Sequence, residues 1–373
     1  MKIPAFILAF LCALAPIRAS AAYDPFENAK AAAVFDRLTE TFLYEKNSHE
    51  SLPVASTTKI MTSLLALEDE AADEVFKVSP DAVRVEGSSM GLLSGDEVTL
   101  RDLCFGMLLP SGNDAANATA FKMAGSIQAF AALMNERAEK LSMKDTHFST
   151  PSGLDSGKNL SSAHDMALLA NEALKNEDFR STAGSKTAKV SVGKRSLYLK
   201  NHNRLLFEDD GFTGVKTGFT KKAGRCLVSS FEAKGREFII VTLNLCGDFE
   251  AHSFTKKAIE KKLEEIDLAK LFKGGNVKVT GGNKASASLY LKDEGRRALF
   301  PNEIKNLTTE NKTQHFLYSP APIDTIAGEF IVKTGEKEIL ALPLYTSSGV
   351  ELKEEENALE KFRKFWSFNI LDN

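Results

Sequence analysis

The sequence predicts an α+β protein with more than one domain. The chain has 373 residues, of which 43% are hydrophobic and 26% charged, so it is long enough to bury a sizeable core. Apolar residues recur at helical spacing after Ser56, whereas residues 224–231 and 236–245 have the pattern of two strands joined by a turn. From Val277 the pattern changes to short alternating runs separated by Gly and Pro, which indicates a separate β-rich domain.

Residues 1–21 have the pattern of a secretory signal peptide. Lys2 precedes an apolar run over residues 3–14, and Ala19-Ser20-Ala21 supplies the small residues of a cleavage site. The apolar run is too short to cross a membrane comfortably. We therefore expect an exported protein that is cleaved after Ala21, and a retained membrane-anchoring N-terminus is the alternative.

Composition excludes some classes of partner. After removal of residues 1–21 the chain carries 45 basic and 50 acidic residues, and no basic patch points to nucleic acid. There is no CxxC pair and no histidine cluster at metal-ligand spacing, so we predict no metal and no cofactor. The cysteines beyond residue 21 are expected to be buried apolar residues: Cys104, Cys226 and Cys246.

The first chemical feature is Ser56-x-x-Lys59. Pro53 and the following Ser and Thr residues indicate that a helix begins near Ser56. Residues three apart share a helix face, so the Lys59 amine can reach the Ser56 hydroxyl. A neutral amine there can take the hydroxyl proton, which makes serine a competent nucleophile. The pattern alone favours an ordinary helix start with a solvated lysine, because it recurs at Ser191 with Lys194 and at Ser253 with Lys256.

The second feature is Ser111-Gly112-Asn113. Pro110 and Gly112 predict a turn between two helical runs, and such a turn can point Ser111 and Asn113 into a cleft. Beside the first pair, the Ser111 hydroxyl could relay a proton to a leaving amine, and the Asn113 amide could hold a substrate backbone. A turn with polar caps between helices is the alternative.

The third feature is Lys216-Thr217-Gly218, which precedes the two predicted strands and is expected on an antiparallel strand at the edge of the cleft. Gly218 would let a peptide lie close to the strand, while Lys216 and Thr217 offer a charge and a hydroxyl to a terminal carboxylate. The same tripeptide at residues 333–335 lies between two strand-like runs, so it predicts a plain hairpin turn.

Other segments complete the expected first domain. Strand-like runs at residues 33–35 and 42–44 predict a hairpin that leads to the Ser56 helix. Residues 127–142 and 162–176 predict amphipathic helices, and residues 253–272 predict a charged helix that closes the domain. Glu172 continues the helical period of its segment, so we interpret it as a solvated helix residue.

Taken together and in this order, the three features resemble the signature of penicillin-recognising serine enzymes. The surrounding stretches Leu43-Tyr44-Glu45-Lys46-Asn47 and Asn201-His202-Asn203-Arg204-Leu205-Leu206 narrow the resemblance. From about residue 25 to 260 the chain is similar to low-molecular-mass penicillin-binding proteins that are serine-type D-alanyl-D-alanine carboxypeptidases, peptidase family S11.

The resemblance implies an architecture. Residues 22–272 would form a β-lactamase/transpeptidase-like domain, in which an antiparallel sheet has helices on both sides. A small all-β domain would follow in residues 273–350, and a C-terminal amphipathic helix in residues 351–373. That last segment places Leu359, Phe362, Phe365, Trp366 and Ile370 on one stripe with basic flanks, which suits a membrane interface. A helix packed on the β domain is the alternative.

The resemblance also implies roles for the site residues. Ser56 would attack the bond between the terminal D-alanines of a peptidoglycan pentapeptide, Lys59 would be the general base and Ser111 the proton shuttle. Other residues would hold the substrate: Asn113, Lys216, Thr217 and Gly218. The backbone N–H groups of Ser56 and Phe219 would meet the oxyanion. β-Lactam antibiotics would acylate the same serine.

The role of Lys59 as a general base depends on its protonation state, which the sequence alone does not determine. A free lysine titrates near 10.4, so Lys59 acts as a base only if burial and the charge of Lys216 disfavour its charged form. The chain also lacks, in residues 247–252, an arginine that some relatives carry after the last core strand to help hold the carboxylate. Carboxylate binding would then depend more on Lys216 and Thr217.

Two other functions stay open. A β-lactamase would need a deacylating base, and the sequence offers none. A catalytically silent cell-wall or penicillin-binding protein would keep the pocket without releasing D-alanine. The expected location is the periplasm or the outer face of the cytoplasmic membrane.

Overall fold

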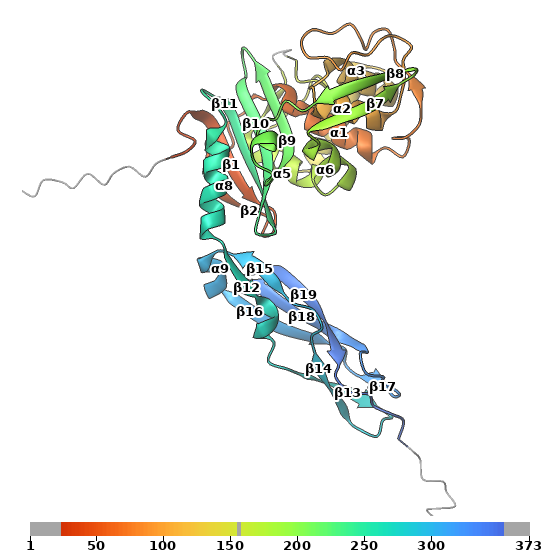
Figure 1. The fold of residues 1–373 in the computed structure, drawn as a ribbon, viewed down its shortest axis with the longest axis vertical. Helices are drawn as coiled ribbons and strands as arrows, with labels where there is room; N and C mark the ends of the chain where they lie inside the picture. The colour runs from red at the N-terminus through yellow and green to blue at the C-terminus, as the bar shows by residue number, and fades with distance from the viewer. Residues whose placement is uncertain (1–23, 155–157, 354–373) are drawn as a thin grey trace, which may run out of the picture.

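The structure is a computed structural model that describes residues 24–154 and 158–353. They form two bodies arranged end to end (Figure 1): an N-terminal body, residues 24–262, and a C-terminal body, residues 264–353. A five-stranded antiparallel sheet of order β2-β1-β11-β10-β9 organises the N-terminal body. Its strands are β1 (Ala29–Asp36), β2 (Thr41–Lys46), β9 (Phe212–Thr220), β10 (Gly224–Ala233) and β11 (Arg236–Leu245). The predicted α+β class is confirmed.

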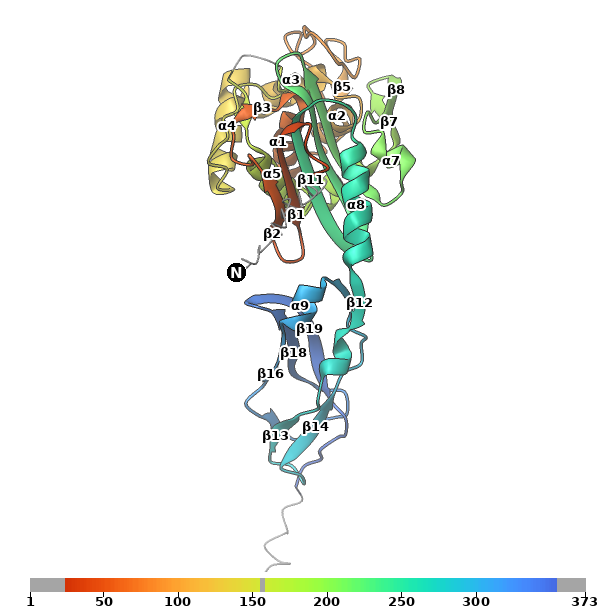
Figure 2. The same ribbon diagram turned by 90° about the vertical axis from the view of Figure 1, so that its left-hand side faces the viewer.

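Successive residues of a strand point to opposite faces of the sheet, and in these strands both sets are apolar. Each face of the sheet is therefore covered by a hydrophobic core. Along β1, Ala33 and Phe35 join the larger core, whereas Ala32 and Val34 join a smaller core on the opposite face. The larger core packs against α1 (Lys59–Glu68), α2 (Leu100–Leu108), α3 (Asn113–Ala124), α4 (Ile127–Lys140), α5 (Ala163–Ala173) and α6 (Glu177–Gly184). On the other face lies α8 (Glu250–Lys262), as Figure 2 shows.

Short elements connect these layers. They are β3 (Leu52–Pro53), β4 (Phe76–Lys77), β5 (Glu97–Val98), β6 (Leu160–Ser161), β7 (Thr187–Val192), β8 (Arg195–Lys200) and α7 (Leu205–Glu208). The predicted hairpin at residues 33–44 and the paired strands at 224–245 are confirmed as β1–β2 and β10–β11.

The amphipathic helix predicted over residues 162–176 is confirmed as α5, which ends at Ala173; Asn176 then caps α6 by accepting a hydrogen bond from the Phe179 N–H at 3.0 Å. Two other predictions from the sequence are wrong. The helix expected over 253–272 ends at Lys262, after which residues 264–267 pair as a strand. Cys104 and Cys226 are buried as expected, but Cys246 is exposed just after β11.

The C-terminal body is built mainly from strands. A six-stranded sheet has the order β16-β18-β19-β14-β13-β17, and β12 pairs with β15 beside it. The elements are β12 (Glu264–Asp267), β13 (Asn276–Thr280), β14 (Ser286–Tyr290), β15 (Arg296–Leu299), α9 (Pro301–Lys305), β16 (Leu307–Thr313), β17 (Leu317–Tyr318), β18 (Ile326–Thr334) and β19 (Lys337–Thr346). The second Lys-Thr-Gly tripeptide lies at the β18–β19 turn, as predicted.

A buried ion cluster joins the two bodies. Arg236, at the start of β11, donates from Nε to Asp36 Oδ1 at 3.0 Å. Its two terminal nitrogens donate to Glu303 of α9 at 2.7 and 2.8 Å, in a bidentate arrangement. The side chains of Arg236 and Asp36 are 2% and 0% exposed, so loss of one partner would leave an uncompensated buried charge. The bodies are therefore held together by charge as well as by the chain.

A neutral histidine is buried where α8 covers the sheet. His252 Nδ1 lies 2.7 Å from the Ser229 hydroxyl, and Nε2 lies 2.9 Å from the Thr242 hydroxyl. Burial lowers the pKa of His252 to about 3. The folded protein therefore excludes a proton that the unfolded chain accepts near pH 6.5.

This histidine should make folding stability depend on pH. Its contribution is complete above pH ~6.5 and is lost, at about 1.4 kcal/mol per pH unit, as the pH falls toward about 3. Between pH 6.5 and 5 the free energy of unfolding should fall by about 2 kcal/mol from this group alone. Urea denaturation at both pH values should show a smaller loss in His252→Gln, with the exposed His315→Gln as the control. Equal losses in wild type and His252→Gln would contradict this assignment.

Candidate active site

Ser56 lies in a tight helical turn that runs directly into α1. Residues Ala55–Thr58 form a 3-10 helix, so the predicted helix start is confirmed, with a first turn tighter than expected. Ala55 has φ of 47°, a strained conformation for a residue with a side chain. Gly153 backs this turn so closely that a Cβ there would lie 1.9 Å from the Ala55 carbonyl oxygen. Only glycine fits at that position.

Lys59 is fully buried one turn behind Ser56. Its Nζ lies 2.9 Å from Ser56 Oγ, 2.8 Å from Asn113 Oδ1 and 2.7 Å from the Ser152 carbonyl oxygen. The Asn113 amide is oriented by its other end, because Nδ2 donates to the Glu86 carbonyl at 2.7 Å. Two of the three neighbours of Nζ can therefore only accept hydrogen bonds.

This arrangement suits a neutral amine. A neutral Nζ has two hydrogens for the two oxygen acceptors and one lone pair, which is left for the Ser56 hydroxyl hydrogen. Burial, followed by the charge of Lys216, lowers the pKa of Lys59 well below its ordinary value, and Asp114 acts in the opposite direction. The sequence analysis required that burial and the charge of Lys216 disfavour the charged form of Lys59, and both do so in the structure. Lys59 can therefore act as a base toward Ser56.

The turn between α2 and α3 supplies Ser111 and Asn113. Ser111 is nearly buried and has φ of 65°, so its hydroxyl is held by a strained turn. The turn is fixed by Asp114, whose buried carboxylate accepts the backbone N–H groups of Met90 and Leu92 at 2.9 and 3.0 Å. This anchoring role of Asp114 was not predicted, although the residue directly follows the Ser-Gly-Asn motif.

Strand β9 closes the other side of the site. It lies at the edge of the sheet, as predicted, and pairs with β10. A Cβ on Gly218 would lie 3.1 Å from the Ser56 backbone nitrogen, so the strand packs directly against the turn that carries the serine. Lys216 is buried, its Nζ donates to the Thr217 carbonyl at 2.9 Å, and burial lowers its pKa to about 7.

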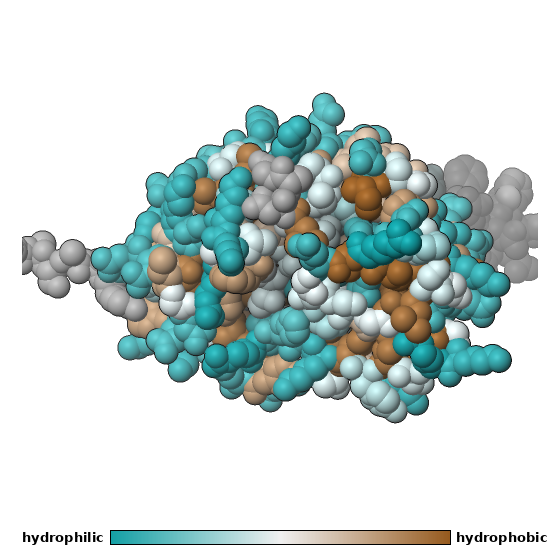
Figure 3. Space-filling view, turned by 90° about the horizontal axis from the view of Figure 1, so that it is seen from above, coloured by the Kyte–Doolittle hydropathy of each residue, from teal (hydrophilic) through white to brown (hydrophobic). Residues whose placement is uncertain are grey.

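A cleft of about 440 Å³ opens between these elements. It is lined by Ser56, Ser88, Ser111, His202, Arg204, Thr217, Gly218, Phe219, Arg225, Asp248 and Phe249. Lys59, Asn113 and Lys216 are buried and are not part of this lining. Figure 3 views the end of the N-terminal body remote from the C-terminal body, where hydrophobic patches lie among hydrophilic side chains. Phe219, with 67% of its surface exposed, is one hydrophobic residue of the cleft.

The sequence analysis assigned no role to three residues of this cleft that carry basic side chains: His202, Arg204 and Arg225. His202 and Arg204 belong to a stretch that contributed to the family resemblance, but no role was assigned to them. Burial and then the charge of Lys216 lower the pKa of His202. Arg225, the second residue of β10, lies directly opposite Phe219, and no sequence pattern around it indicated a role in the cleft.

Glu172 does not belong to the site. Its carboxylate pairs with Arg137 at 3.0 Å and with Lys175 at 2.9 Å, and it is absent from the cleft lining. The side chain is 26% exposed, so the prediction of a solvated helix residue was only partly right.

Comparison with known proteins identifies the family of this chain. The sequence profile of the D-alanyl-D-alanine carboxypeptidases, peptidase family S11, matches residues 18–246. The chain belongs to this family. The resemblance inferred from the motifs is thereby confirmed, and the protein is a serine-type D-alanyl-D-alanine carboxypeptidase.

Individual S11 relatives cover different shares of the chain. D-alanyl-D-alanine carboxypeptidase DacF of Bacillus subtilis is 34% identical over 252 residues, which are 66% of this chain and 64% of DacF. DacC of Escherichia coli is 31% identical over 363 residues, which are 92% of this chain and 90% of DacC.

Solved structures of similar proteins give the same result for the fold. The D-alanyl-D-alanine carboxypeptidase DacD from Francisella tularensis superposes with a TM-score of 0.61 at 27% identity, over 87% of this chain and 94% of that one. The Streptomyces K15 DD-transpeptidase gives 0.56 at 31% identity, over 61% of this chain and 95% of that one.

Proposed function

We propose that this S11 carboxypeptidase removes the terminal D-alanine of peptidoglycan pentapeptides through an acyl-enzyme on Ser56. The observation that carries the proposal is the buried Lys59 amine, 2.9 Å from Ser56 Oγ and bound on its other sides to two acceptor oxygens. A lysine in these surroundings has a lone pair for the serine proton and no exposure to water that would stabilise its charge.

The reaction then follows from the positions of the groups. Lys59 takes the Ser56 proton as Oγ attacks the carbonyl carbon, and the backbone N–H groups of Ser56 and Phe219 stabilise the oxyanion. Ser111 relays the proton held by Lys59 to the amine of the leaving D-alanine as the peptide C–N bond breaks, which leaves Lys59 neutral and Ser56 acylated. Water then hydrolyses the ester, and Ser56 recovers its proton. A β-lactam acylates Ser56 by the same steps, and the resulting acyl group is hydrolysed slowly.

We assign substrate binding to four residues: Asn113, Lys216, Thr217 and Gly218. Gly218 leaves room for the peptide along β9, and the Thr217 hydroxyl and Lys216 charge serve the terminal carboxylate. Asn113 is already bonded at both ends, to Lys59 and to the Glu86 carbonyl. Its contact with substrate would use the second N–H of the amide nitrogen that bonds the Glu86 carbonyl, and its first task is to orient Lys59.

Arg225 is proposed as an additional cation for the carboxylate. It lines the cleft and is exposed, and no hydrogen bond or ion pair joins its guanidinium to another residue in the described ranges. Arg204, by contrast, is paired with Glu208 at 2.8 Å and Asp248 at 3.5 Å. A free cation at the cleft rim compensates for the arginine that is missing after the last core strand.

Replacing Arg225 by alanine should weaken substrate binding. An exposed ion pair contributes about 1 kcal/mol, so we expect KM for the pentapeptide to rise about fivefold with kcat unchanged. Steady-state kinetics with free-acid and C-terminally amidated peptides would measure this, because only the free acid should respond. Lys222→Ala, a nearby exposed cation outside the cleft lining, is the control. An unchanged KM for the free acid would remove Arg225 from the binding site.

The proposed function is tested by two measurements on the same preparation. D-Alanine release from a synthetic pentapeptide should be catalytic, and mass spectrometry after penicillin treatment should place the adduct on Ser56. An adduct on another serine would overturn the assignment of the nucleophile. A folded protein that is acylated but releases no D-alanine would be a silent penicillin-binding protein instead.

The β-lactamase alternative gains no support from the site. Its best candidate for a deacylating base, Glu172, is engaged in ion pairs with Arg137 and Lys175. We therefore expect penicillin to be released slowly. Rapid turnover of penicillin would favour the alternative.

The remaining assignments concern location and domains. Enzymes of this family act on the cell wall, which indicates a location in the cell envelope. We propose that this protein is located in the periplasm or on the outer face of the cytoplasmic membrane. We propose residues 1–21 as the signal peptide, 22–272 as the catalytic domain, 273–350 as the β-rich domain and 351–373 as an amphipathic membrane anchor. The first and nearly all of the last segment lie outside the described residues. Among the described helices, none combines the length and the apolarity needed to cross a membrane.

A further inference from the structure

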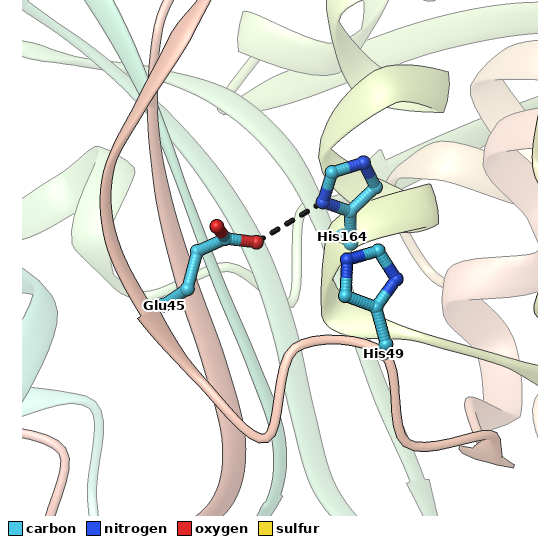
Figure 4. A group of neighbouring side chains, drawn as sticks. All are labelled: Glu45, His49 and His164. Atoms are coloured by element: carbon cyan, nitrogen blue, oxygen red, sulfur yellow. Dashed lines mark hydrogen bonds and ion pairs between the residues drawn. The ribbon is translucent and has the colours of Figure 1, made fainter.

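Two histidines and a glutamate from separate parts of the chain converge on the N-terminal body. Glu45 comes from β2, His49 from the loop between β2 and β3, and His164 from the first turn of α5 (Figure 4). One potential ligand atom from each lies within 4.8 Å of the other two. The sequence showed no histidine cluster at metal spacing, because His49 and His164 meet only in the fold.

His49 and Glu45 each have a supporting hydrogen bond of the kind that metal ligands usually have, whereas the hydrogen bond between His164 and Glu45 joins two of the proposed ligands. His49 Nδ1 lies 2.8 Å from Asp145 Oδ2, so its Nε2 is the nitrogen left for a ligand. His164 Nδ1 lies 3.0 Å from Glu45 Oε1, and the Ser48 hydroxyl donates to the same oxygen at 2.7 Å. Metal-binding histidines commonly donate their second nitrogen to a carboxylate, and metal-binding carboxylates are commonly hydrogen-bonded themselves.

The surrounding backbone holds these groups in place. The His164 N–H donates to the Ser48 carbonyl at 2.9 Å, which ties α5 to the loop that carries His49. The Asp145 N–H donates to Asp165 Oδ2 at 2.8 Å, which ties the supporting carboxylate to the same helix. The two imidazole rings stack with centroids 4.3 Å apart, and Phe42 stacks on His164 at 4.2 Å.

We propose that Glu45, His49 and His164 bind a divalent transition metal ion of the zinc type, with water as the fourth ligand. Two imidazoles and one carboxylate form a typical zinc ligand set, whereas calcium and magnesium prefer oxygen ligands alone. With metal–ligand bonds of about 2.1 Å, tetrahedral ligand atoms lie roughly 3.4 Å apart. The distance of 3.0 Å between His164 Nδ1 and Glu45 Oε1 is near this value, and bonds to the metal would replace the hydrogen bond between these two atoms. The His49 ring, whose side chain is 64% exposed, would have to turn out of its stack on His164 to bring Nε2 to the metal.

We expect the bound metal to stabilise the fold and to have no part in the hydrolysis of the peptide. None of its three ligands lines the catalytic cleft. His49 lies on the segment that continues through β3 to Ser56, and the metal would tie this segment to β2 and α5. Metal binding should therefore raise the melting temperature and leave D-alanine release unchanged.

The test uses untagged, chelator-treated protein and zinc chloride. Isothermal titration calorimetry should give one zinc ion per chain, with a parallel rise in Tm. The double variant His49→Ala/His164→Ala should lose both signals, and Asp145→Asn should weaken affinity roughly 10- to 100-fold because it removes the partner of His49. His147→Ala, an exposed histidine outside the cluster, is the matched control.

Penicillin acylation of each variant would show that it is folded. Zinc binding that survives in the folded double variant would overturn the proposal. So would a wild-type protein that shows neither heat nor a Tm shift with zinc in excess, in which case the cluster is a hydrogen-bonded contact only.

Discussion

Replacing Ser56 by alanine should abolish both D-alanine release and covalent labelling by penicillin. Removal of a catalytic nucleophile costs on the order of 10⁴-fold or more in kcat, because no other group forms the acyl-enzyme. The Lys59 amine would remain in place, held by Asn113 and the Ser152 carbonyl. D-Alanine assay and mass spectrometry of the penicillin-treated protein measure the two losses.

The control for this experiment is Ser51→Ala, which changes an exposed serine on the same segment. It should keep both activities. Penicillin labelling that persists in Ser56→Ala would mean that the nucleophile is another serine, and Ser111, whose hydroxyl lines the same cleft, would be examined next.

Substitution of Lys59 should reduce acylation strongly, even when positive charge is retained. Lys59→Met removes the base, and Lys59→Arg keeps a cation that has no available lone pair at any pH at which the protein is folded. We expect both variants to lose on the order of 10²- to 10⁴-fold in the rate constant of acylation by a β-lactam, which stopped-flow measurements provide.

The comparison of the two variants separates two roles of the lysine. Near-normal acylation in Lys59→Arg would show that Lys59 acts through its charge and not as a base. Because Lys59→Met leaves the oxygen acceptors of Asn113 and Ser152 without their donor, thermal denaturation of each variant is needed to establish that it folds.

The sequence predicted those parts of the site that depend on local geometry. Spacing on a helix brought Lys59 to Ser56, and the paired strands after residue 224 placed Lys216–Gly218 on an edge strand. The resemblance to S11 enzymes added the roles. Burial of Lys59 could not be predicted in this way, because its amine contacts Asn113, at the start of α3, and Ser152, which both lie far along the chain.

The features that the sequence analysis did not predict also depend on contacts between distant parts of the chain. Gly153 must be glycine because the Ala55 carbonyl lies against it, which no local pattern reveals. Arg225 has a role only because β10 places it opposite Phe219. The helix predicted over 253–272 was too long, because the sequence pattern did not show that residues 264–267 pair as a strand with β15.

The Arg236 cluster has a mechanical consequence. Strands β9 and β10 place the cleft at their Gly218–Arg225 end, whereas Arg236 lies at the opposite end of the β10–β11 hairpin. Eight residues of extended strand separate Arg225 from Ala233, a span of roughly 26 Å. A pull on the C-terminal body would therefore load the sheet at its far end through Arg236, and it would also reach the cleft along α8, which begins directly after Asp248 and Phe249 of the cleft lining.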